Sequence, residues 1–63
     1  MKIDTQAYLE KVLLDTQERV RSFAQYSDHS EDDGLKKSFK KFAIQEGYIA
    51  QEILSFLNKS EQA

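Results

Sequence analysis

The stretch that decides the fold is LKKSFKKFAIQEGYIAQEILSFL, residues 35–57. It contains no proline, and its apolar side chains return after four and then three residues, which keeps them on one face of an α-helix. The residues on this spacing are Leu35, Phe39, Phe42, Glu46, Ile49, Ile53 and Phe56, and Ala43, Ala50 and Leu57 flank them. The stretch therefore predicts an amphipathic helix whose apolar stripe is interrupted once, at Glu46.

The N-terminal half repeats the pattern. Its residues on the same spacing are Leu9, Leu13, Thr16, Val20 and Phe23. Between the two halves lies an acidic segment in which Asp28 with Glu31, and Ser30 with Asp33, have the spacing of helix capping pairs. We expect a single domain, residues 1–63, with a first helix at about 4–26, an acidic loop at 27–30 and a second helix at about 31–58.

Folding the chain back at the acidic loop brings the two stripes into register. Seam residues then face each other when their numbers sum to 62, as in Phe23 with Phe39 and Leu13 with Ile49. The predicted seam and dimer core consists of Leu9, Leu13, Val20, Phe23, Leu35, Phe39, Phe42, Ile49, Ile53 and Phe56. Such agreement between local pattern and hairpin geometry is typical of a specified fold.

A chain of 63 residues is too short to bury a large core alone, and it contains no cysteine and only one histidine, so disulfides and a thiolate zinc site are excluded. Oligomerisation is the remaining way to cover the stripes. We therefore expect an all-α antiparallel two-helix hairpin that dimerises into a four-helix bundle, as a homodimer or a higher homo-oligomer.

One layer of the predicted seam is polar, because Thr16 faces Glu46. An ionised carboxylate is costly to bury without a partner. Glu46 could hydrogen-bond to Thr16, to a tyrosine hydroxyl or to water and so fix the register; it could bind a cation or a small ligand together with the Glu46 of a second subunit; or the seam could open and expose it.

The segment around Glu46 resembles the metal-binding helix of ferritin-like proteins, including rubrerythrins and the short encapsulated ferritins. Ala43, Glu46 and Ala50 match the family pattern Ala-x-x-Glu-x-x-His-Ala, while Ile49 stands at the histidine ligand and Thr16 where the short ferritins place a glutamate. The resemblance implies a ferritin-like bundle that has lost its di-metal site, without ferroxidase activity. The chain is also similar to short two-helix proteins of spore-forming bacteria.

Lysines make a second candidate surface. Lys36, Lys37, Lys40 and Lys41 follow one another on the second helix, and Arg19 and Arg21 could add to them from the first helix. This layout resembles the RNA-binding bundles of Rop-type plasmid regulators. With a net charge of −2, the chain as a whole has no positive field to attract nucleic acid, and a solvated face balanced by nearby acids is the simpler interpretation.

The remaining features favour a non-catalytic oligomeric interaction or scaffold protein. No serine has a plausible activating partner and no glycine-rich phosphate loop is present, so we expect no enzyme and no cofactor. There is neither a signal-peptide pattern nor a long uncharged stretch, so we expect a cytoplasmic protein that makes no membrane contact. A protein partner fits this interpretation better than nucleic acid does.

Overall fold

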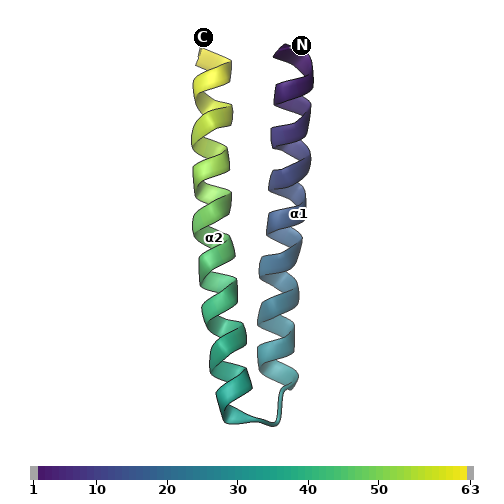
Figure 1. The fold of residues 1–63 in the computed structure, drawn as a ribbon, viewed down its shortest axis with the longest axis vertical. Helices are drawn as coiled ribbons and strands as arrows, with labels where there is room; N and C mark the ends of the chain where they lie inside the picture. Colours follow the sequence, from purple (N-terminus) through teal and green to yellow (C-terminus); the bar gives the residue numbers. More distant parts are fainter. Residues whose placement is uncertain (1, 63) are drawn as a thin grey trace.

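The computed structural model describes the backbone of residues 2–62 and the side chains of residues 4–59. Two helices, α1 (Lys2–His29) and α2 (Asp33–Gln62), run antiparallel and pack against each other. Figure 1 shows the start of α1 and the end of α2 at one end of the pair and the connection at the other. The prediction of an all-α helical hairpin is confirmed.

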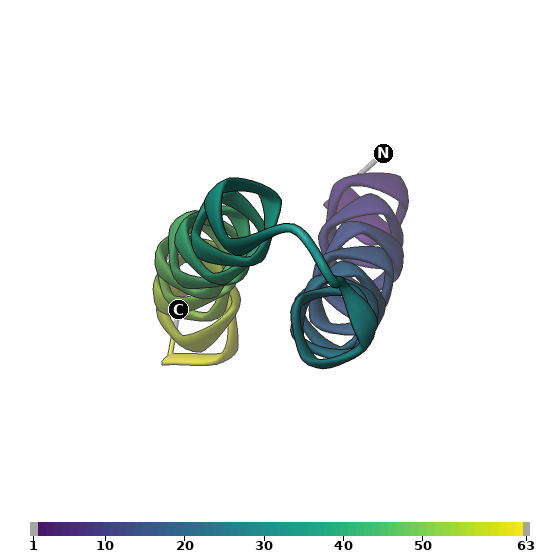
Figure 2. The same ribbon diagram turned by 90° about the horizontal axis from the view of Figure 1, so that it is seen from below.

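The hairpin is a rod rather than a globule. Its extents are 47 × 15 × 12 Å and its radius of gyration is 14.5 Å, whereas a compact domain of this length would have a radius of about 11 Å. In the end-on view of Figure 2 the two helices lie side by side, and no further layer covers either side of them. Only three apolar side chains in the described part are buried, namely those of Ala50, Ile53 and Leu57.

The seam between the helices follows a seven-residue repeat on both partners. The buried or half-buried positions that follow this repeat on α1 are Leu9, Leu13, Thr16, Val20, Phe23 and Ser27; those on α2 are Lys36, Phe39, Ala43, Glu46, Ala50, Ile53 and Leu57. Phe23 and Phe39 stack with ring centroids 6.1 Å apart. The register expected from the sequence is therefore present at this layer.

On α2 the seam is rotated relative to the expected one. Leu35, Phe42, Ile49 and Phe56 were expected in the seam, but each is exposed in the single hairpin. Their places are taken by the residues that follow each of them, which include the two alanines Ala43 and Ala50. Small side chains let two helices approach closely, so the larger side chains are displaced to the side of the seam.

The helix boundaries also differ from the expected ones. α1 continues through Ser27 to His29, and the connection is only residues 30–32. Ser27, expected in the loop, is buried and its hydroxyl donates a hydrogen bond to the carbonyl of Lys36 at 2.9 Å. This bond joins the end of α1 to the start of α2 and keeps Ser27 within the helix, so the turn comes later in the chain than the loop expected at 27–30.

Asp32 caps α2. Its Oδ1 accepts the backbone N–H of Leu35 at 2.9 Å, and its carbonyl accepts the N–H of Lys36 at 2.8 Å. The capping pairs expected at Asp28 with Glu31 and at Ser30 with Asp33 are not the ones that close this helix. Ser30 instead hydrogen-bonds to the backbone of Asp32. Its hydroxyl donates to the Asp32 carbonyl at 3.3 Å and accepts the Asp32 N–H at 3.4 Å.

Replacing Asp32 with alanine should lower the free energy of unfolding by about 1 kcal/mol, since the first turn of α2 loses a side-chain acceptor. Glu31→Ala is the matched control, because Glu31 is an exposed neighbouring acid that makes no such bond. Urea unfolding followed by circular dichroism at one protein concentration measures the difference. If both variants lost the same free energy of unfolding, the negative charge near the start of α2 would matter, and not the hydrogen bond from the Leu35 N–H to Asp32.

Candidate functional site

The most prominent surface feature is an apolar face along one side of the seam, which we call the open face. It consists of Val12, Arg19 and Tyr26 on α1 and Leu35, Phe42, Ile49 and Phe56 on α2. Each member directly precedes a seam position and recurs every seven residues. In an antiparallel helix pair, such positions from both helices lie on the same side of the seam.

Contacts across the seam support this placement. The Phe42 ring meets Phe23 of α1 with centroids 5.6 Å apart, and Tyr26 meets Phe39 of α2 at 5.5 Å. Residues of the open face on one helix thus lean over the other helix. Apart from Arg19, every member is apolar or aromatic and remains at least two-fifths exposed.

A polar layer interrupts the open face at mid-length. Nε of Arg19 donates to Oε1 of Glu46 at 2.9 Å, and Nη2 of the same guanidinium donates to the Thr16 hydroxyl at 3.2 Å. The Thr16 hydroxyl in turn donates to the carbonyl of Val12 at 2.7 Å. Thr16 is fully buried, whereas the side chains of Glu46 and Arg19 are 20% and 48% exposed.

Thr16 and Glu46 lie in this layer as predicted from the sequence, whereas Arg19 was expected on a basic outer surface. Two signals in the sequence could have identified it. Arg19 stands midway between Val12 and Tyr26 at seven-residue spacing, and it follows Thr16 by three residues, so it lies one turn along the same helix face. The ion pair joins α1 to α2, and the positive charge of Arg19 balances the negative charge of the Glu46 carboxylate.

The arrangement around Glu46 is unlike a metal site. Within the described residues, no three side chains of histidine, cysteine, aspartate or glutamate gather where they could hold a metal ion. The group beside Glu46 is a guanidinium, which is cationic and cannot act as a ligand. A cation at Glu46 would therefore have to displace Arg19 or be repelled by it.

The four lysines of α2 do not share one uniform environment. Lys36 is half-buried at the seam, while Lys37, Lys40 and Lys41 are exposed. Lys40 also lines a hollow on the side of the seam away from the open face. Only part of the basic cluster is thus a freely exposed surface.

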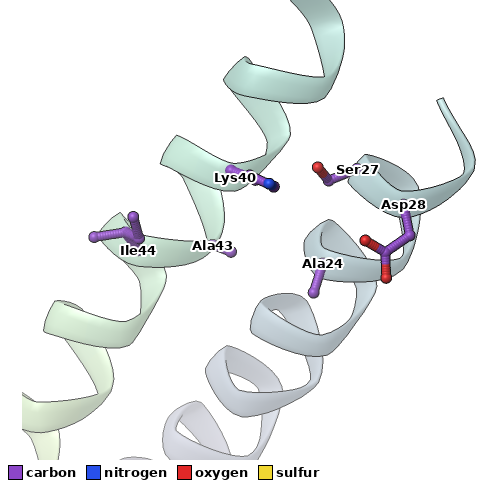
Figure 3. Close-up of a pocket in the computed structure, with 6 residues that line it drawn as sticks. All are labelled: Ala24, Ser27, Asp28, Lys40, Ala43 and Ile44. Atoms are coloured by element: carbon purple, nitrogen blue, oxygen red, sulfur yellow. The ribbon is translucent and has the colours of Figure 1, made fainter. Parts of the chain in front are cut away.

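That hollow has a volume of about 210 Å³ and is lined by Ala24, Ser27, Asp28, Lys40, Ala43 and Ile44. Figure 3 shows Lys40 extending from α2 towards Ser27 on α1, while Asp28 lies at the edge. The Ser27 hydroxyl is already engaged by the Lys36 carbonyl. The hollow is a shallow gap above two alanines, next to the acidic connection.

Within residues 2–62, neither helix is long and apolar enough to cross a membrane. Comparisons of the chain with protein-family models, curated proteins and solved structures found no match.

Proposed function

We propose that the chain is a non-catalytic self-assembly module, in which two hairpins cover each other's open face and form an antiparallel four-helix bundle. The observation that carries this proposal is the open face itself. Six large apolar side chains in one band along a thin rod, interrupted only at Arg19, are unusual for a protein that remains a monomer. They have the spacing that helices use to pack against other helices.

The size of the face also fits a second copy. The two larger extents of the rod are 47 and 15 Å, so its broad side measures about 700 Å² in flat projection. Side chains make the accessible surface of this side larger than its projection, so the face can supply the ~800 Å² that each partner contributes to a standard protein interface. A second hairpin has the same length and the same apolar band. It would therefore match the face from end to end.

Repulsion among the acids of the connection favours the arrangement in which the two connections lie at opposite ends. The connection and its neighbours carry Asp28, Glu31, Asp32 and Asp33. Two copies with their connections together would bring eight carboxylates to one end, whereas opposite placement separates them by roughly 40 Å, several times the ~10 Å screening length at moderate salt.

A ferritin-like ancestry remains part of this proposal, with the bundle kept and the di-metal site lost. The Arg19–Glu46 ion pair at 2.9 Å supports the loss, because a guanidinium occupies the position beside the carboxylate. It also makes residual metal binding at Glu46 the weaker alternative. RNA binding through the α2 lysines is weaker still, since Lys36 is half-buried and the chain is acidic as a whole.

A test of the proposed function is thermal unfolding at several chain concentrations. If folding and self-association are coupled, each tenfold increase in concentration should stabilise the folded dimer by about 1.4 kcal/mol, and the midpoint should rise accordingly. Circular dichroism from low micromolar to near-millimolar chain measures it. A midpoint independent of concentration would count against self-association.

A further inference from the structure

We infer that the polar layer is the register key of the homodimer: the Arg19–Glu46 pairs of the two copies meet at mid-height and form one charge network across the interface. This inference rests on the proposed self-association and adds to it the residues that fix how the copies align. The observation behind it is that a charged pair interrupts the open face, where every other described member is apolar or aromatic.

The position of the pair along the rod determines where it would meet its counterpart. Thr16 lies near the middle of α1 (Lys2–His29), and Glu46 lies near the middle of α2 (Asp33–Gln62). Two copies related by a two-fold axis and overlapping over their full length must therefore place their polar layers at the same height. The two polar layers lie at the same height whichever helix of one copy packs against whichever helix of the other.

The exposure of the pair indicates that it is available to a second copy. Arg19 is about half exposed although it already donates to Glu46 and to Thr16. A guanidinium has five N–H donors, and these two bonds use only part of them. Oε1 of Glu46 is the acceptor from Arg19, so the other carboxylate oxygen can still accept a bond from the partner.

Any other alignment leaves these charges against apolar side chains. A slip by one seven-residue repeat would set the Arg19–Glu46 pair of one copy level with the apolar residues Val12 and Ile49, or Tyr26 and Leu35, of the other copy. The same would hold in reverse. Covering charged groups without polar partners is costly, while apolar side chains tolerate many alignments. Buried polar residues in helical bundles have this role of selecting one register.

The test uses two single variants, Arg19→Glu and Glu46→Arg, refolded together. A homodimer of the first carries four carboxylates at mid-height, and a homodimer of the second carries four guanidinium groups, so both are disfavoured. The mixed dimer contains two of each sign. We expect native mass spectrometry to find the mixed dimer enriched on the order of tenfold over random mixing, with the enrichment falling as salt is added.

The matched control is the exposed pair Lys11–Asp15, whose atoms lie 3.4 Å apart on α1 alone. Lys11→Asp and Asp15→Lys reverse the same kinds of charge away from the open face. Their mixture should contain homodimers and mixed dimers in random proportion. The chain that carries both Arg19→Glu and Glu46→Arg keeps an ion pair of its own and should dimerise, which checks that these positions accept either sign.

The outcomes separate the two proposals. If the parent chain stays monomeric at all concentrations, self-association itself is wrong. If the parent dimerises but the Arg19 and Glu46 variants mix at random, the dimer stands and the register key is refuted. Should either variant alone fail to fold, mixing must restore helical circular dichroism and the mixed dimer; failure of that complementation also refutes the register key.

Discussion

Replacing Ile49 with glutamate is expected to abolish the dimer at micromolar concentrations and to weaken it at least ~100-fold. Ile49 belongs to the open face and lies one helical turn from Glu46. The substitution would bring an unpaired carboxylate into each half of the proposed interface, beside a carboxylate that is already there. Uncompensated buried charge of this kind costs several kcal/mol, and about 1.4 kcal/mol corresponds to each tenfold loss of affinity.

Leu54→Glu is the matched control for this variant. Leu54 is on the same helix and is 41% exposed, against 43% for Ile49, but it follows a seam position instead of preceding one, so it lies on the opposite side of the seam. Sedimentation velocity on both variants and the parent measures association. The open face would be the wrong surface if Leu54→Glu dissociated the protein as strongly as Ile49→Glu, or if Ile49→Glu had no effect.

The second large effect is expected from Ile53→Ala, which should lower the free energy of unfolding by roughly 2 to 4 kcal/mol. Ile53 is one of three buried apolar side chains in the described part of the hairpin, with 8% exposure. Removing its methylene and methyl groups leaves a gap between the helices that two rigid rods cannot close. A core this small rarely supplies more than about 5 kcal/mol, so most of the stability would be lost.

Ile44→Ala provides the comparison, because it deletes the same atoms from a side chain that is 60% exposed. Its effect should stay below ~1 kcal/mol. Chemical unfolding of parent and variants at one concentration gives both values. Similar losses at Ile44 and Ile53 would mean that the seam does not run where the structure places it.

The two-helix layout could be predicted from the sequence because the apolar spacing and the acidic break are strong local signals. The rotation of the seam on α2 could not be predicted. Phe39 and Ile53 are spaced correctly both with the series that contains Phe42 and with the series that contains Ala43, so periodicity alone cannot decide which series enters the seam. Side-chain size decides it, because alanine permits the closer approach of the helices.

The polar layer was predictable in position but not in composition. Thr16 and Glu46 could be paired by counting from the loop, but whether a third residue joins them depends on side-chain reach. Arg19 is long enough to cross from α1 to Glu46 while it also contacts Thr16. The end of α1 could not be predicted either. The hydrogen bond from Ser27 to the Lys36 carbonyl joins two helices, so it forms only when they pack together.

Coupling of folding to self-association is tested most simply by the mass of the protein in solution. Sedimentation equilibrium from low micromolar to near-millimolar concentration measures this mass, with helicity followed in the same samples. We expect twice the chain mass of 7.3 kDa wherever the protein is helical. A fully helical, cooperatively folding species with the mass of one chain would contradict it, since the open face would then be stable in water without a second copy.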